Sequence, residues 1–427
     1  MKLIFDVSDK PKAGQLVVFA LQQMLAILAA TIAVPLIIGN GLTPAAAMFG
    51  AGVGTIVYIL FTKRKSPVFL GSSFAFLGSM AAAFAGGVSM QLGMLGLIVG
   101  AFLAGLVYVV IAIVVKFVGV GWLNKLMPAV VIGPTVAIIG LSLAGNAIGD
   151  LVKGDVTKQV TEYAVSTDSG TPEIIETVSN VPVGSSYVAL ICGLITLAVV
   201  MLCSTYGKKT LRLIPFIIGI LAGYAAAAIF TVIGNICDID ALKIVDFSVF
   251  SSYMLTDGSV SLKTFVSLPD FAFVSGLKGL KEFDFSYFAT IFVAYVPVAL
   301  VVFAEHVADH KNLSSIIDHD LLEEPGLTRT LLGDGVGSIA GALFGGCPNT
   351  TYGESVACVA ITGNASVVTI FAAAIGCMLF SFITPLVAFV DSIPACVMGG
   401  VCIALYGFIA VSGLKMIQDA NLDDNRN

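Results

Sequence analysis

The sequence predicts an all-α polytopic membrane protein, organised as an inverted repeat of seven plus seven transmembrane segments. Three observations lead to this fold class: the composition, the length of the apolar segments, and two interrupted segments that mirror each other. Of 427 residues, 58% are hydrophobic and 11% charged, with a mean hydropathy of +1.01. Soluble domains carry about 25% charged residues, which excludes that class. A transmembrane barrel would show alternating segments of ~10 residues, and the sequence lacks them.

Twelve apolar segments account for most of the chain. About 20 apolar residues are needed for a helix to cross ~30 Å of hydrocarbon. Candidate spans lie at 14–38, 44–62, 67–86, 92–115, 127–149, 186–206, 211–236, 285–308, 329–345, 351–363, 366–390 and 394–414. The first run, Leu16 to Ile38, is too long for a signal peptide and is expected to be a span. The long polar connections are 150–185 and 237–284.

The distribution of lysine and arginine predicts the orientation. With a cytoplasmic N-terminus, fifteen cations fall inside: Lys2, Lys10, Lys12, Lys63, Arg64, Lys65, Lys116, Lys125, Lys208, Lys209, Arg212, Lys311, Arg329, Lys415 and Arg426. Six fall outside: Lys153, Lys158, Lys243, Lys263, Lys278 and Lys281. All six belong to the two long connections, where the positive-inside rule carries least weight. We therefore expect a cytoplasmic N-terminus. Arg212 and Arg329 stand at the ends of their spans, and we expect no Lys or Arg in the interior of a span.

The glycine spacing, the cysteine positions and the net charge restrict the packing, the metal content and the partners that we expect. Glycines recur every fourth residue at Gly333, Gly337, Gly341 and Gly345, and also at Gly50/Gly54 and Gly96/Gly100. Such faces allow helices to approach closely in lipid, which predicts a compact bundle. Six of the eight cysteines lie in apolar spans without metal-ligand spacing, so we expect packing residues, no metal and no cofactor. The net charge is −6 and no basic cluster indicates nucleic acid.

The two interrupted segments are the third and the tenth. Residues 66–76 read SPVFLGSSFAF, and residues 345–355 read GGCPNTTYGES. Each has a proline, then hydroxyl residues, then an aromatic residue, and then becomes helical. By the orientation above they run in opposite directions, and paired interrupted segments of this kind indicate an inverted-repeat transporter with its binding site between them. Their offset of seven spans predicts the seven-plus-seven architecture; the alternative is two unrelated kinks.

Three acidic residues are candidates for the chemistry. Glu354 follows the break in the tenth segment, where a carboxylate is costly unless it has a function. Glu305 and Asp309 are four residues apart, so both face one side of the eighth helix, and their proximity favours proton uptake. The alternative for Glu305 is the cytoplasmic interface, because Phe285 to Ala304 already spans the bilayer.

Other polar residues near these acids are expected at the periphery. We expect Asp334 at the membrane interface. His306, His310 and His319 are expected at the cytoplasmic rim rather than as metal ligands, since no two share ligand spacing with a third donor. Without a metal or water-bearing cluster, an intramembrane enzyme is not expected.

The residue types around the breaks predict a flat, neutral, hydrogen-bonding ligand. Carboxylates accept from ring N–H groups, and backbone amides at the helix breaks donate to carbonyl groups. Phe74 and Tyr352 offer aromatic faces for the ring. An anion carrier would need a fixed cation, and neither interrupted segment has one.

At this point the chain resembles a known family. Gly71-Ser72-Ser73-Phe74-Ala75-Phe76, Ala304-Glu305-His306-Val307, Pro348-Asn349-Thr350-Thr351-Tyr352-Gly353-Glu354 and Val397-Met398-Gly399-Gly400-Val401 are similar to motifs of the nucleobase–ascorbate transporters (nucleobase:cation symporter-2), in the bacterial uracil or uracil-xanthine permease branch. The order and spacing match over essentially the whole chain.

This resemblance implies a proton-coupled symporter that imports a nucleobase, uracil first, into a bacterial-type cell by alternating access across the plasma (inner) membrane. It implies broken segments with a short strand followed by a helix. A core domain would comprise 14–116 and 284–390, and a gate domain 127–236 and 394–416. Position by position, the resemblance implies that Glu305 and Glu354 hydrogen-bond the base and that the backbone of Phe74 and Gly353 contacts its polar edge. Ala30, Tyr352 and Tyr406 would line the pocket. Glu305 and Asp309 would couple protons. A homodimer is expected from the family only.

Four departures qualify the expectation. Asp309 replaces a histidine of the best-known uracil permease and is common in purine-type relatives, so a xanthine or purine permease is the alternative; an anion transporter on the same fold is a further one. Gln22-Gln23 replaces Gln-His, and Cys402 replaces a serine. The chain ends at 423–427, where the family continues into two more spans, so we expect a fragment that lacks part of the gate domain.

Overall fold

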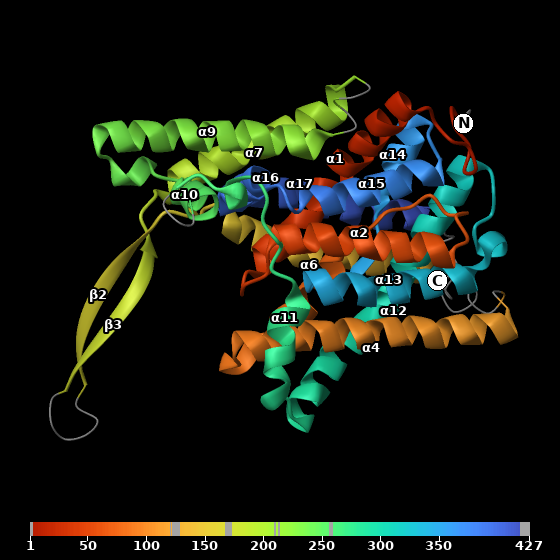
Figure 1. The fold of residues 1–427 in the computed structure, drawn as a ribbon, viewed down its shortest axis with the longest axis horizontal. Coiled ribbons are helices and arrows are strands. Elements are labelled where there is room, and N and C mark those ends of the chain that lie inside the picture. The colour runs from red at the N-terminus through yellow and green to blue at the C-terminus, as the bar shows by residue number, and fades with distance from the viewer. Residues whose placement is uncertain are drawn as a thin grey trace.

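The computed structural model describes residues 3–119, 121, 129–166, 173–208, 211, 214–255 and 259–418, and it is a bundle of helices (Figure 1). The major helices are α1 (Ala13–Ile38), α2 (Pro44–Phe61), α3 (Leu77–Ala83), α4 (Met90–Val118), α6 (Ala129–Asp150), α7 (Ser186–Tyr206), α9 (Pro215–Cys237), α12 (Phe285–Ile317), α13 (Leu327–Gly345), α14 (Gly353–Thr362), α15 (Val367–Phe380), α16 (Thr384–Asp391) and α17 (Ala395–Gln418). The four strands are β1 (Leu70–Ser72), β2 (Thr157–Ser166), β3 (Glu173–Pro182) and β4 (Asn349–Thr351).

Short helical turns connect these elements. They are η1 (Phe74–Phe76), η2 (Ala85–Gly87), η3 (Asp240–Leu242), α10 (Ser248–Met254), η4 (Leu262–Thr264), α11 (Ala272–Gly276), η5 (Leu277–Lys281) and η6 (Leu322–Gly326). Within the described residues, seven helices are long and apolar enough to cross a membrane. The predicted polytopic helical architecture is therefore confirmed. Lys2, Lys125, Lys209, Arg212 and Arg426, which contribute to the predicted orientation, and the chain end at 423–427 lie outside the described residues.

Two of the predicted spans differ in detail from the helices. The span at 366–390 consists of two helices, because α15 ends at Phe380 and α16 begins at Thr384. Pro385 occupies the first turn of α16, where its missing N–H costs nothing, but it cannot continue α15. The eighth helix, α12, has 33 residues, about 50 Å at 1.5 Å per residue, and thus exceeds the hydrocarbon thickness.

The predicted glycine faces bring α2 and α13 into backbone contact. A Cβ atom added to Gly54 would lie 2.7 Å from the carbonyl oxygen of Gly337, and one added to Gly345 would lie 2.9 Å from that of Ala46. Gly96 and Gly100 of α4 likewise leave room for aromatic side chains of α12. Close approach through small residues is how helices pack without a hydrophobic driving force in lipid. The prediction of a compact bundle is confirmed.

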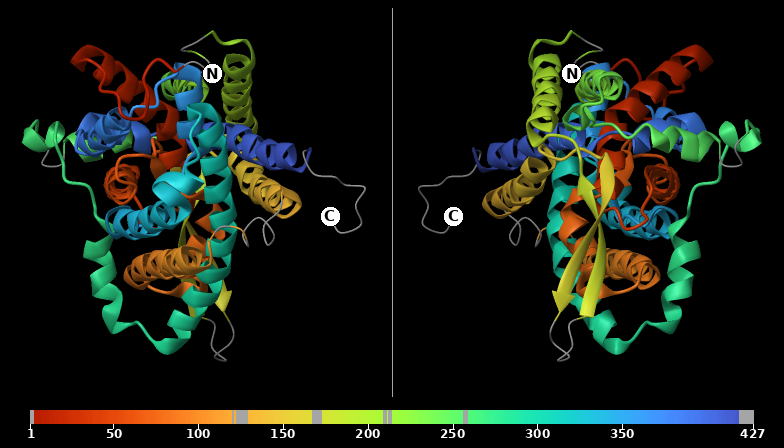
Figure 2. Two further views of the ribbon diagram at one scale, coloured as in Figure 1. Left: turned by 90° about the vertical axis from the view of Figure 1, so that its right-hand side faces the viewer. Right: turned by 90° about the vertical axis from the view of Figure 1, so that its left-hand side faces the viewer.

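The helices pack in two groups. One group contains α1, α2, α4, α12, α13 and α15, and the other contains α6, α7, α9 and α17. Helices α7 and α9 lie on the opposite side of the bundle from α4 (Figures 1 and 2). Helix α12 contacts α6, and α1 contacts α17, so the boundary between the groups runs along α1 and α12.

Two segments outside the helices are a β-hairpin and the N-terminal segment. Strands β2 and β3 pair antiparallel from Thr157 opposite Pro182 to Ser166 opposite Glu173, and this hairpin projects from one end of the molecule (Figure 1). Near the N-terminus, Phe5 bridges Asn364, and the N–H of Ala365 donates to the carbonyl oxygen of Phe5 at 2.9 Å. The N-terminal segment thus holds the turn between α14 and α15.

Asp155 stabilises the start of α17. Its Oδ1 accepts a hydrogen bond from the backbone N–H of Ala395 at 3.2 Å. Burial raises the pKa of the Asp155 carboxyl to about 6; the Ala395 N–H opposes this shift, and the nearby acids Asp246 and Asp150 add to it. The carboxyl lies in the connection after α6, outside the membrane-spanning helices.

We predict that Gly54→Ala lowers the melting temperature of the purified protein. The added methyl group would collide with the backbone of Gly337, and overpacking of this kind costs about 1–3 kcal/mol. Gly145→Ala is the control, because nothing lies within 4 Å of its added Cβ atom. Equal melting temperatures for Gly54→Ala and the wild type would contradict the close packing of α2 and α13.

Asp155 also generates a pH-dependent prediction. An acid whose pKa is higher in the folded than in the unfolded state destabilises the fold as pH rises through its folded pKa. Asp155→Asn keeps an acceptor for Ala395 but removes the charge. We expect the variant to melt at a higher temperature than the wild type at pH 7.5, and this difference to disappear as pH falls from 6 towards 4. A difference that is constant with pH would refute the assignment.

Candidate functional site

The two interrupted segments meet in the middle of the bundle. Strands β1 and β4 pair antiparallel, with Leu70 opposite Thr351 and Ser72 opposite Asn349. Backbone hydrogen bonds extend the ladder at both ends, from Ser73 N to the Pro348 oxygen at 2.9 Å and from Tyr352 N to the Phe69 oxygen at 3.2 Å. Non-helical backbone at membrane depth needs partners inside the protein. The breaks supply these partners to each other, as their mirrored sequences predict.

Side chains from neighbouring helices satisfy the outer edges of the two strands. Thr55 Oγ1 accepts from Leu70 N at 2.9 Å and donates to the Leu70 oxygen at 3.1 Å. On the other strand, Ser338 Oγ accepts from Asn349 N at 3.0 Å, and Asn349 Nδ2 donates to the Gly50 oxygen at 3.1 Å. One hydroxyl group from α2 and one from α13 therefore close the ladder on opposite sides.

Each strand turns directly into a helix. Helix η1 begins at Phe74, and α14 begins at Gly353 without a side-chain cap. The first amides of an uncapped helix are free donors at the positive end of its dipole. The Tyr352 hydroxyl donates to the Ser72 oxygen at 2.7 Å, and the Tyr352 ring occupies the space that a side chain at position 71 would need. Gly71 is therefore required by the position of this ring.

A cavity of about 390 Å³ lies against the helix starts. This volume is in the range of small-molecule sites. Its polar wall includes Glu305, Asp309, Asn312, Thr350 and Glu354, while its apolar wall consists of residues from both helix groups, among them Phe74, Ala75, Val136, Phe216, Tyr352, Phe408 and Ile409. The backbone of Gly353 also lines it. Five of the seven predicted ligand-contacting residues thus surround one space.

The remaining two predicted pocket residues are buried but do not line the cavity. Ala30 is buried with 1% exposure and Tyr406 with 2%, and neither belongs to the lining. The Tyr406 ring packs edge-on against that of Phe74, with centroids 5.5 Å apart. Their contact with a ligand stays a prediction.

The three cavity carboxyl groups have different surroundings. Within the described part of the chain, neither Glu305 nor Glu354 has a hydrogen bond from its side chain to another residue. Asp309, in contrast, accepts at Oδ2 from the Thr351 hydroxyl at 2.7 Å. A half-buried carboxylate without a protein partner is able to accept hydrogen bonds from a ligand. Glu305 and Glu354 therefore have free acceptor capacity, whereas Asp309 is held by β4.

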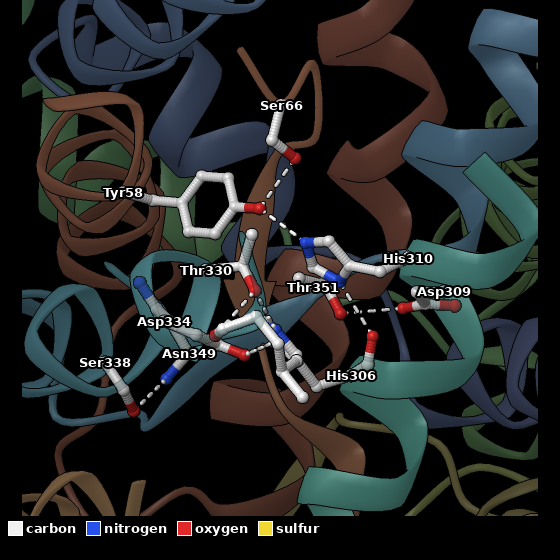
Figure 3. A network of polar contacts seen from close by, with 11 residues as sticks. Tyr58, Ser66, His306, Asp309, His310, Thr330, Asp334, Ser338, Asn349 and Thr351 are labelled. Carbon is white, nitrogen blue, oxygen red and sulfur yellow. Dashed lines mark hydrogen bonds and ion pairs between the residues drawn. The ribbon is translucent and has the colours of Figure 1, made fainter. Parts of the chain in front are cut away.

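Behind the cavity, His306 and Asp334 form a buried pair (Figure 3). Their Nδ1 and Oδ2 atoms are 2.6 Å apart, and both side chains are completely buried. His306 Nε2 lies 3.1 Å from Thr330 Oγ1. The second carboxyl oxygen of Asp334 has no hydrogen-bond partner among the described residues. The pair joins α12 to α13.

His310 continues this network towards α2 (Figure 3). Its Nδ1 is 2.7 Å from the carbonyl oxygen of His306, so Nδ1 carries the hydrogen. In the neutral ring Nε2 then accepts from the Tyr58 hydroxyl at 2.6 Å, and Tyr58 accepts from Ser66 Oγ at 2.7 Å. Each donor in this chain has an acceptor.

These positions correct two expectations. Asp334 is wrong as an interfacial residue, with 0% exposure, and His306 and His310 are wrong as rim residues, with 0% and 1%. Mutual hydrogen bonds replace the water that each group would otherwise need. Only His319, half-exposed beside Glu324, fits the expected periphery. Glu305 lines the cavity. Because α12 continues past it to Ile317, the end of the apolar run at Ala304 is not the end of the helix and did not predict where Glu305 lies.

Sequence reasoning missed a junction at the start of α14. Ser355 Oγ accepts from Phe69 N at 3.0 Å, and Gln23 Nε2 of α1 also donates to it. Gln23 and Ser355 are 332 positions apart, and nothing in the sequence indicates that they are in contact. The sequence also did not predict Thr350, Thr351 and Asn312 as residues of the site. The run of hydroxyl residues before Tyr352 was the one feature that indicated the first two.

Comparisons with known proteins agree with these features. The sequence model described as "Permease family" matches residues 14–427. The chain is 35% identical to a uracil permease of Bacillus caldolyticus, covering 99% of this chain and 84% of that protein. It is 32% identical to a uracil permease of Escherichia coli (strain K12), covering 98% and 83%.

Solved structures show a similar fold. The transmembrane domain of the cyanobacterium bicarbonate transporter BicA aligns with a TM-score of 0.62 at 13% identity, covering 99% of this chain and 93% of that one. The murine anion transporter Slc26a9, in its inward-facing state, aligns with a TM-score of 0.59 at 13% identity, covering 96% and 62%. At this identity the likeness concerns the fold alone.

Proposed function

Because the chain belongs to the permease family, as its resemblance to nucleobase–ascorbate transporters indicated, we propose that it is a proton-coupled symporter that imports uracil. It is a multi-pass membrane protein of a transporter family, and a nucleobase is the substrate class that its relatives' names and its site chemistry support together. The observation that carries the proposal is the convergence of Glu305 and Glu354 on one cavity beside the uncapped start of α14; neither carboxyl group has a partner side chain among the described residues.

The chemistry of uracil fits this site. Its ring has N–H groups, which donate hydrogen bonds to Glu305 and Glu354. Its carbonyl oxygens accept hydrogen bonds from the backbone at Phe74 and Gly353. Tyr352 contributes an aromatic wall. The lining contains no Lys or Arg among the described residues, which disfavours an inorganic anion despite the fold shared with anion transporters.

Proton coupling is assigned to Glu305 and Asp309. They are one helical turn apart on α12, and Glu354 faces them from α14. Three carboxyl groups close together repel one another when all are ionised, which favours entry of a proton with the neutral base. The first helix group is assigned to a core domain and the second to a gate domain, with the cavity between them and the N-terminus in the cytoplasm of a bacterial inner membrane.

Xanthine is the alternative substrate. It presents the same N–H and carbonyl edge on a larger, bicyclic ring, and Asp309 at the position of a histidine is the feature that favours it. Uracil and xanthine are both proposed to bind at this site, so uptake of either base tests it.

We predict that the protein in proteoliposomes accumulates labelled uracil when the outside is acidic, and that a protonophore abolishes accumulation. A nucleobase that binds should also raise the melting temperature. Xanthine uptake without uracil uptake would replace the substrate assignment. A lack of stabilisation by any base, together with a lack of uptake, would refute the proposed function.

Glu305→Gln and Glu354→Gln should each reduce uracil uptake by about 10- to 100-fold, because each loses a charge-assisted hydrogen bond to the base. Glu323→Gln is a matched control, since Glu323 is exposed and outside the cavity. Membrane insertion of all three variants should equal that of the wild type. Near-normal uptake by either cavity variant would remove that residue from the binding site.

A further inference from the structure

Asp309 is the cavity carboxyl that is attached to the tenth segment. Its Oδ2 accepts from the Thr351 hydroxyl at 2.7 Å. Its Oδ1 lies 3.9 Å from the position of a Cβ atom added to Gly353. Both carboxyl oxygens of Asp309 therefore lie beside the three residues at which β4 turns into α14. This is also the stretch of backbone assigned to the polar edge of the base.

The start of α14 responds to charge. Tyr352 N donates to the Phe69 oxygen, and Val356 N donates to the Tyr352 oxygen, so these two amides are occupied. The N-cap side chain does not cap the helix, and the Glu354 amide interacts with its own carboxyl group, which leaves the Gly353 and Ser355 amides for another acceptor. An ionised carboxylate interacts favourably with this positive helix end, and a protonated one does so much less.

Charged Asp309 has few stabilising partners. The titratable groups that face it are Glu305 on its own helix, Glu354 on α14 and Asp334 on α13, with Tyr58 and Tyr108 from α2 and α4. The first three are acids. Among the described residues, the Thr351 hydroxyl and the start of α14 are thus the groups that stabilise its charge, and both belong to the tenth segment.

We propose that Thr351 is a positioning residue that couples the protonation of Asp309 to the substrate-binding backbone at Tyr352 and Gly353. This inference rests on the proposed function and names the link between its proton and its substrate. With Asp309 ionised, the Thr351 O–H donates to Oδ2 and the carboxylate stays against the start of α14. A proton that binds Asp309 from outside removes the charge and weakens both contacts, so that the positive start of α14 attracts a carbonyl oxygen of the base instead. Release of the base allows the proton to leave to the cytoplasm.

Thr290 provides a control outside the cavity. It lies on α12, the helix that carries Asp309, but it is exposed and does not line the cavity. Its hydroxyl group donates to the Ser286 oxygen of its own helix at 3.1 Å. Val has nearly the shape of Thr and is well tolerated in strands, so Thr351→Val suits β4. Thr290→Val and Thr351→Val thus remove one hydroxyl each, and only the second change removes the contact with Asp309.

The experiment measures uracil binding by thermal shift and uracil uptake in proteoliposomes, each from pH 5 to 9, for the wild type, Thr351→Val, Thr351→Ser and Thr290→Val. In Thr351→Val the pH of half-maximal uptake should rise by about one unit, the displacement expected when a carboxylate loses a hydrogen bond. The KM for uracil should depend less on pH than in the wild type. Thr351→Ser, which keeps the hydroxyl, and Thr290→Val should retain the wild-type profile.

The outcomes separate the inference from the function on which it rests. If the wild type binds and transports uracil but Thr351→Val keeps the wild-type pH profile, Thr351 is not the coupling residue. An equal displacement in Thr290→Val would show that the effect does not depend on the contact between Thr351 and Asp309 and would also overturn the inference. Absence of binding and uptake in the wild type would refute the proposed function, and this inference with it.

Discussion

The structure depends on the need of every backbone amide and carbonyl at membrane depth for a partner inside the protein. Two segments stop being helical in the middle of the bundle, and each would be costly alone. Paired as β1 and β4 they satisfy each other, and hydroxyl groups of Thr55 and Ser338 satisfy the outer edges. The close approach of α2 and α13 through their glycines brings these hydroxyl groups within reach. The site exists because helix starts follow directly from this paired backbone.

The same requirement divides the acidic residues into two kinds. Asp334 is paired with His306, and Asp309 with Thr351, so their positions are determined by the fold. Among the described residues, Glu305 and Glu354 line the cavity without such partners. A buried polar group without a partner costs about 1–3 kcal/mol, and in a binding site the ligand recovers that cost. Of the four acids, these two therefore mark the surface proposed to bind the base.

Much of this arrangement could be predicted from the sequence, because hydropathy and helix-breaking residues are local signals. The spans, the two breaks, their pairing and the cavity position of Glu354 follow from such signals. The cavity position of Glu305 does not, since the apolar run ends at Ala304 whereas α12 continues to Ile317. His306, His310 and Asp334 were misplaced because hydropathy treats each polar group as if it were alone, whereas these groups satisfy one another. The Gln23–Ser355 contact joins positions too distant for any sequence pattern.

Fold and function are only loosely connected in this architecture. The bicarbonate transporter BicA and the anion transporter Slc26a9 have the same fold at 13% identity, so the paired breaks alone do not select a substrate. Selection must come from the side chains at the helix starts. Two free helix starts favour an acceptor-rich or anionic ligand, and in this chain carboxyl groups are placed opposite them. An anion would meet those acids at close range and be repelled, whereas a neutral ring with both N–H and C=O groups finds a complementary partner on each side. The proposed selection of a neutral base therefore rests on the carboxyl groups that line the cavity beside the helix starts.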